Sequence, residues 1–118
     1  KDNGLKWLDV YSQTGGEYNM TIGYLSGESR SMTVEVNGVD VKTLTSLNSG
    51  DWGKVATKTI KINLEKGSNT IYLYNKSAWM PNIDYMKLTL VTPLPDGISA
   101  LKADQKGIVI KNNKKVVQ

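Results

Sequence analysis

Glu17-Tyr18-Asn19-Met20-Thr21-Ile22-Gly23-Tyr24 is the stretch of this sequence that decides the fold. Its aromatic and apolar side chains fall on every second residue, and polar or small side chains fall between them. Successive side chains of a β-strand point to opposite faces of a sheet, so such alternation is typical of a strand with one buried face. The stretch therefore predicts a half-buried antiparallel strand.

The same period of two recurs along most of the chain. Residues that share one face of further expected strands are Met32, Val34 and Val36; Ala56, Ile60, Ile62 and Leu64; Ile71 and Leu73; and Met86, Leu88 and Leu90. Turn residues separate these runs, at Gly15-Gly16, Asn37-Gly38, Asn48-Ser49-Gly50 and Lys66-Gly67-Ser68-Asn69. Asn37-Gly38 is a two-residue hairpin signal, because both residues accept a positive φ. With no helical period over three turns, the pattern predicts an all-β antiparallel sandwich or jelly roll.

The sequence changes character after Leu90. Two prolines in Thr92-Pro93-Leu94-Pro95-Asp96-Gly97 favour a stiff linker, because proline cannot join a central ladder of hydrogen bonds. We therefore expect a β-sandwich over residues 1–91, a linker over 92–97, and a short β tail or the start of a further element over 98–118. Asn112-Asn113 is the expected turn of a C-terminal hairpin.

Composition excludes several functions. The chain of 118 residues has no cysteine and no histidine, so thiol chemistry, imidazole bases and His/Cys zinc sites are impossible. Residues 1–97 hold ten Lys and Arg against ten Asp and Glu, and the whole net charge of +4 comes from residues 98–118. The main body thus lacks the basic face that nucleic acid requires. No apolar run is long enough for a membrane span.

Trp79-Met80-Pro81-Asn82 combines an indole, a corner stiffened by proline and an amide. A sugar needs both an apolar platform for its C–H face and a polar partner for its hydroxyl rim, so Trp79 and Asn82 are candidates for sugar binding. Trp52 lies in a polar loop flanked by glycine and is a second candidate platform. The alternative is structural: Trp79 covers the rim of the fold and Asn82 caps a turn. Trp7, in an apolar strand, is expected in the core.

An enzyme would have to use carboxylates. The candidates Glu17, Glu28, Asp51 and Asp84 are scattered, and their positions suit a strand face, turns and a strand start. Glycoside hydrolysis needs two facing carboxyl groups at a fixed separation, which the sequence does not indicate. We therefore expect no catalytic residues.

Six motifs occur in an order that resembles the carbohydrate-binding modules of families 6 and 35, as attached to bacterial α-galactosidase-like glycoside hydrolases. They are Gly16-Glu17-Tyr18-Asn19-Met20-Thr21-Ile22, Ser26-Gly27-Glu28-Ser29-Arg30-Ser31, Val36-Asn37-Gly38, Ser49-Gly50-Asp51-Trp52, Lys66-Gly67-Ser68-Asn69-Thr70-Ile71 and Pro81-Asn82-Ile83-Asp84-Tyr85. The resemblance covers about residues 4–91. It implies a jelly roll that binds sugar without catalysis among the loops at one end, with Trp52 as a stacking residue and Asn82 as a hydrogen-bonding residue.

The resemblance also carries expectations about the rest of the protein. It implies an accessory module, with a galactose-binding-like fold, that holds a tethered bacterial catalytic domain on an oligo- or polysaccharide, in an exported protein. It requires no cofactor and leaves a structural calcium open, because the family normally begins with an acidic first strand that we expect this chain to lack. Missing strands would leave open sheet edges, through which a homodimer could form. The alternative function is a structural or protein-interaction sandwich that packs against a catalytic domain.

Overall fold

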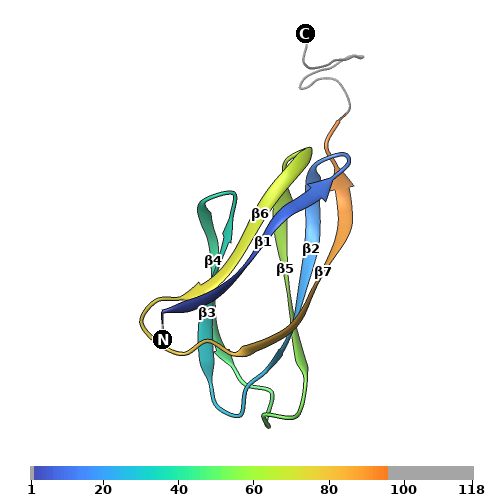
Figure 1. The fold of residues 1–118 in the computed structure, drawn as a ribbon. Helices are drawn as coiled ribbons and strands as arrows, with labels where there is room; N and C mark the ends of the chain where they lie inside the picture. The colour runs from blue at the N-terminus through green and yellow to red at the C-terminus, as the bar shows by residue number, and fades with distance from the viewer. Residues whose placement is uncertain (1, 96–118) are drawn as a thin grey trace.

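The computed structural model describes residues 2–95, which form a sandwich of two antiparallel sheets (Figure 1). Its seven strands are β1 (Asn3–Ser12), β2 (Gly16–Leu25), β3 (Arg30–Val36), β4 (Val39–Leu47), β5 (Ala56–Leu64), β6 (Gly67–Asn75) and β7 (Asn82–Pro93). One sheet has the order β1-β6-β3-β4 and the other the order β5-β2-β7. The prediction of an all-β antiparallel sandwich is confirmed.

The alternating residues of the central strands build the core between the sheets. β2 pairs with β5 on one side and β7 on the other, so its apolar face meets the opposite sheet along its length. The fully buried side chains of Met20, Ile22, Val34, Ile71 and Leu73 come from β2, β3 and β6, the inner strands. Trp7 packs against this core from β1, as the sequence indicates.

The β3–β4 hairpin turns at Asn37 and Gly38, whose φ angles of 51° and 85° are both positive. Two positive φ angles define a turn whose twist matches that of paired strands. The hairpin signal in the sequence is therefore confirmed, and Val36 pairs directly with Val39.

Connections between strands gather at the two ends of the sandwich (Figure 1). The short turns β1–β2, β3–β4 and β5–β6 lie at one end. The loops at residues 26–29, 48–55 and 76–81 follow β2, β4 and β6 and therefore lie toward the other end. These three loops hold both tryptophans that the sequence singles out for binding.

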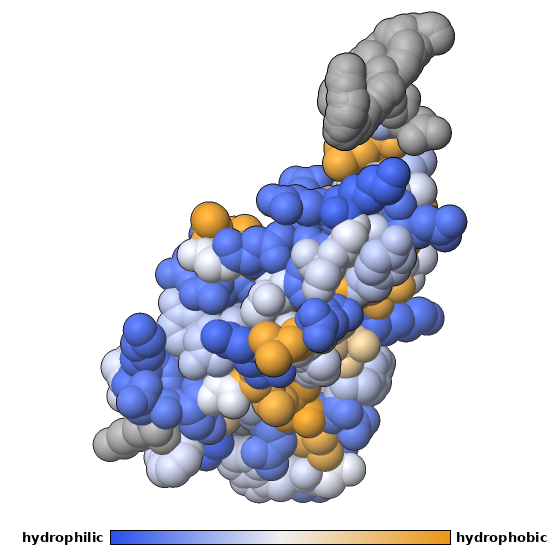
Figure 2. All heavy atoms as spheres, turned by 45° about the horizontal axis from the view of Figure 1, so that its top comes forward, coloured by the Kyte–Doolittle hydropathy of each residue, from blue (hydrophilic) through white to orange (hydrophobic). Residues whose placement is uncertain are grey.

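Strands β1 and β7 are sheet edges among the residues described. Apolar side chains stay exposed along both, at Leu5 and Leu8 of β1 and at Leu90 and Val91 of β7. Figure 2 shows apolar patches, in orange, within a mostly hydrophilic exterior. Both edge strands therefore leave apolar surface in contact with solvent.

Strand β7 corrects the predicted start of the linker. It continues through Thr92 and Pro93, which pair with Glu17 and Gly16 of β2. Because β7 is an edge strand, Pro93 needs no hydrogen-bond partner on its outer side and is tolerated there. The predicted hairpin over 98–118 lies outside the described residues. Residues 2–95 include no helix of the length and apolarity that crossing a membrane demands.

Candidate functional site

Arg30, the first residue of β3, joins the three loops at the loop end of the sandwich. Its Nε and Nη2 atoms lie 2.8 and 2.7 Å from Oε2 of Glu28 in the β2–β3 loop. Its Nη1 donates a 3.2 Å hydrogen bond to the carbonyl of Met80 in the β6–β7 loop. Its guanidinium carbon lies 4.5 Å from the ring centre of Trp52 in the β4–β5 loop. One planar side chain therefore contacts all three loops.

Trp52 is held in place by the β2–β3 loop, which directly precedes Arg30. A Cβ built on Gly27 would lie 2.5 Å from the indole nitrogen of Trp52, so glycine is needed for this close packing. Ser26 and Ser49 clamp the two loops together: Ser49 N donates to the Ser26 carbonyl at 2.9 Å, and Ser26 N donates to Ser49 Oγ at 3.0 Å. With Arg30 over its ring, Trp52 keeps 44% of its surface exposed.

Trp79 stands at the tip of a loop that is fixed at both ends. The Asn75 side chain donates to the Ser31 carbonyl at 2.9 Å and accepts a 2.9 Å hydrogen bond from the backbone N–H of Ala78. Met80, on the other side of Trp79, is buried in the core. The indole between these anchors is 55% exposed, and no ring or cation among residues 2–95 stacks on it.

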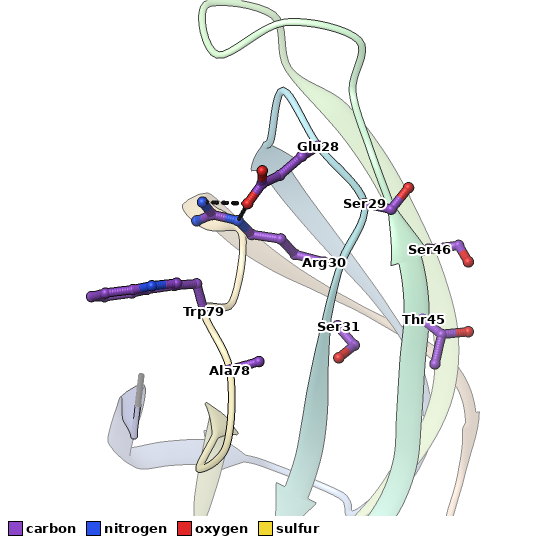
Figure 3. A pocket seen from close by; sticks show the side chains of 8 residues that line it. All are labelled: Glu28, Ser29, Arg30, Ser31, Thr45, Ser46, Ala78 and Trp79. Atoms are coloured by element: carbon purple, nitrogen blue, oxygen red, sulfur yellow. Dashed lines mark hydrogen bonds and ion pairs between the residues drawn. The ribbon is translucent and has the colours of Figure 1, made fainter.

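A cleft of about 430 Å³ lies beside Trp79 (Figure 3). Its volume falls within the range of about 300–1,000 Å³ that is usual for small-molecule sites. Eight residues line it: Glu28, Ser29, Arg30, Ser31, Thr45, Ser46, Ala78 and Trp79. In Figure 3 the joined pair of Arg30 and Glu28 lies above the indole of Trp79, and Ala78 lies below it. The lining residues thus include one tryptophan, four residues that carry a hydroxyl group and one ion pair, and in Figure 3 the side chains of Ser29, Thr45 and Ser46 point away from the indole.

The three residues that the sequence predicts for sugar binding have different positions. Trp79 lines the cleft. Trp52 does not line it but supports Arg30, which does. Asn82 begins β7 and is exposed, but it is not among the lining residues. It follows the buried corner formed by Met80 and Pro81, which separates it from Trp79 along the chain.

Arg30 is the main site residue that the sequence analysis does not single out. A local signal exists, because Glu28 and Arg30 are two residues apart beside a glycine-containing turn. Its role depends, however, on Trp52 and Met80, which are 22 and 50 residues further along the chain. Only the packing of the loops brings these groups together.

Residues 2–95 contain no group of three or more Asp, Glu, His or Cys side chains arranged to hold a metal ion. Backbone carbonyls also bind calcium, so a structural calcium stays a prediction. Of the candidate carboxylates for catalysis, Glu28 alone lines the cleft. A pair of facing carboxyl groups, as glycoside hydrolysis requires, is therefore absent from the lining of this cleft.

Comparisons with known proteins agree with this architecture. A family 35 carbohydrate-binding module from Clostridium thermocellum superposes with a TM-score of 0.67 at 30% identity, over 72% of this chain and 68% of that one. The module Xyl-CBM35, solved in complex with a disaccharide that contains glucuronic acid, gives a TM-score of 0.69 at 26% identity, over 78% and 69% of the two chains. No family model matches the sequence.

A 1,6-α-glucosyltransferase from Sporosarcina globispora is 33% identical over an alignment of 69 residues that covers 56% of this chain. The match spans only 5% of that protein's length, so it concerns a small part of a much longer enzyme.

Fold and relatives together define a non-catalytic β-sandwich module. The chain belongs to family 35 of the carbohydrate-binding modules.

Proposed function

We propose that this chain binds carbohydrate without catalysis, in the cleft beside Trp79. The observation that carries the proposal is an exposed indole on an anchored loop, next to a cleft lined by four hydroxyl groups and an ion pair. An indole face suits the C–H surface of a sugar ring, and hydroxyl and carboxylate groups suit its rim. A purely structural role of the two loop tryptophans would bury them, yet Trp52 and Trp79 are 44% and 55% exposed.

The size of the site predicts weak binding. Removing about 100 Å² of indole and sugar surface from water contributes roughly 2–3 kcal/mol. Each net hydrogen bond adds about 1 kcal/mol, and association costs several kcal/mol. The expected Kd for a single sugar on one platform therefore lies in the millimolar range or above. Asn82 and the open face of Trp52 are proposed to contact further sugar units of a longer glycan.

Weak binding is useful to a protein that is tethered to its substrate by a second contact. We therefore place this module in an exported bacterial protein, where it holds a linked glycoside hydrolase on an oligo- or polysaccharide. The bacterial 1,6-α-glucosyltransferase supports this arrangement, since a segment of about this size forms a small part of a long sugar-modifying enzyme.

A glycan array followed by titration of the intrinsic tryptophan fluorescence tests the proposal. We expect at least one neutral or acidic glycan to change the emission in a saturable way. Trp79→Ala should weaken that binding by at least tenfold, because it removes the platform that lines the cleft.

Tyr11→Ala is the matched control, because Tyr11 is also an exposed aromatic residue but lies at the far end of β1. It should leave binding unchanged. A lack of response across the whole array, or equal losses in both variants, would contradict the proposal.

A further inference from the structure

We infer that the cleft selects neutral sugars over uronic acids, and that Glu28 is the residue responsible. This inference rests on the proposed sugar binding and adds the class of sugar. The observation behind it is the ion pair between Arg30 and Glu28. In the protein without ligand, the positive charge of Arg30 is already neutralised by the carboxylate of Glu28.

The lining of the cleft has no net charge. Among its eight residues Arg30 is the one cation and Glu28 the one anion, and the rest are hydroxyl, methyl or indole side chains. The nearby Lys76 does not line the cleft, and its ammonium group lies 5.7 Å from the ring centre of Tyr74. A carboxylate ligand would therefore meet no uncompensated positive charge among these residues.

Arg30 already uses one of the two edges through which a guanidinium can bind a carboxylate. A guanidinium binds a carboxylate most strongly through two parallel N–H groups. In this structure Nε and Nη2 both point to Oε2 of Glu28, and Nη1 donates to the Met80 carbonyl. Its face lies on Trp52. Binding a uronate through this Nε/Nη2 edge would require Glu28 to leave, at the cost of the existing ion pair.

Glu28 itself favours a neutral ligand. Its side chain is 61% exposed at the rim, and within residues 2–95 its second oxygen, Oε1, receives no hydrogen bond. A carboxylate oxygen accepts hydrogen bonds from sugar hydroxyl groups, which are donors. The same oxygen repels a ligand carboxylate. Two unit charges about 6 Å apart change affinity by roughly threefold at the dielectric constant of water and by far more at the lower value typical of a protein surface. Salt screens part of the effect, and a change of about fivefold lies between these limits.

Matched pairs of sugars test the inference. Methyl α-glucoside and methyl α-glucuronoside differ only at C6, and so do methyl β-galactoside and methyl β-galacturonoside. Each would be titrated by NMR or calorimetry up to about 50 mM, as the expected Kd requires. In at least one pair, the neutral member should bind roughly fivefold more tightly than the acid.

Glu28→Gln should remove this preference, because the amide keeps a hydrogen-bond acceptor for Arg30 but removes the negative charge. The uronate should gain about fivefold or more in affinity relative to its neutral partner. The neutral sugar should lose some affinity, because an amide oxygen accepts hydrogen bonds from hydroxyl groups more weakly than a carboxylate does. Glu35→Gln is the matched control: it makes the same change of charge on β3, five residues from Arg30 and outside the cleft lining.

A wild-type protein that binds the uronate more tightly would overturn the inference and leave the proposed sugar binding intact. If no sugar binds, both the inferred selectivity and the proposed sugar binding are contradicted. If Glu28→Gln does not fold, as judged by circular dichroism, the uronate affinity of the wild-type protein measured at several salt concentrations tests the inference instead. Repulsion by Glu28 requires uronate affinity to rise with salt, and a fall in affinity would overturn the inference.

Discussion

At the scale of single residues, Gly27 controls the position of Trp52 and, through it, Arg30. A methyl group at residue 27 would lie 2.5–3.0 Å from three atoms of the indole, so the ring must move. Gly27→Ala should therefore displace Trp52 from under the guanidinium and weaken sugar binding by about three- to tenfold, as expected for losing a contact of 1 kcal/mol or slightly more. Fluorescence titration measures the loss, and the emission maximum of the free protein reports the displaced indole.

Gly53→Ala provides the control for that experiment. Gly53 directly follows Trp52, but a Cβ there meets no atom within 4 Å, and its φ lies outside the left-handed region. This variant should bind sugar as the wild type does. Equal binding by Gly27→Ala and Gly53→Ala would show that the contact between Trp52 and Arg30 does not matter for the site.

Tyr74 gives the molecule a pH-dependent contact away from the cleft. Its hydroxyl donates to both carboxylate oxygens of Asp40 at 2.9 Å, and this hydrogen bond raises the pKa of Tyr74 above its ordinary value of 10.0. The folded state therefore keeps the phenol proton to a higher pH than the unfolded state. The stability from this contact is fully present below pH 10 and is lost as pH rises through the folded pKa.

Asp40→Asn should lower the pKa of Tyr74 and make unfolding less dependent on pH above 10. Phenolate absorbance measured against pH, combined with urea unfolding at several alkaline pH values, checks both effects. Tyr74→Phe, which has no proton to lose, should show the same weakened dependence. An unchanged tyrosine titration in Asp40→Asn would contradict this explanation.

Residue by residue, the sequence predicts only part of the site. Trp79 could be predicted because a tryptophan before a Met-Pro corner combines an apolar surface with a rigid loop. Arg30 could not, because an arginine beside a glutamate is also typical of an ordinary solvated turn. Its importance comes from Trp52 and Met80, which reach it only through the packing of three loops.

At the scale of elements, the β3–β4 turn depends on a backbone conformation that ordinary side chains disfavour. Gly38 has a φ of 85°, and a Cβ built there meets nothing within 4 Å. Any cost of Gly38→Ala is therefore conformational, and we expect a loss of about 1 kcal/mol in the free energy of unfolding. Urea denaturation measures it.

Gly53→Ala again serves as the comparison, since it also adds a methyl group to open space but at an ordinary φ. It should be neutral or slightly stabilising, because alanine restricts the unfolded chain. If both variants lose the same stability, the positive φ of Gly38 is not the cause.

Strand β4 shows where reading the sequence by alternation fails. Val39 and Val41 near its start are exposed, whereas Leu44 and Leu47 near its end are buried. Two irregularities in its pairing with β3, together with a positive φ at Ser46, interrupt the period of two. β2 has irregularities only in its pairing with β7 and keeps its inner residues in strict alternation, so its sequence was sufficient to predict it.

At the scale of the whole molecule, inner strands and edge strands are unequally protected. The inner strands β2, β3 and β6 carry most of the core, while β1 and β7 end their sheets among the described residues with apolar side chains exposed. The solved family 35 module from Clostridium thermocellum is longer than the matched region, which covers 68% of it. Part of that module therefore has no counterpart in the superposition.

Edge strand β7, which is 12 residues long, is the place where we expect a second copy of the chain to pair. A long edge strand with exposed apolar residues presents unpaired backbone groups that a similar strand can bind. Sedimentation velocity from about 10 μM to 1 mM should reveal dimers that increase with concentration, in the affinity range expected of a small interface.

Val91→Lys should suppress these dimers, because a charge on the edge opposes pairing. Val55→Lys makes the same change in a loop, at a side chain of similar exposure (43% against 41%), and should leave dimers unaffected. A monomer at every concentration, or equal suppression of dimers by both variants, would contradict pairing of two chains through β7.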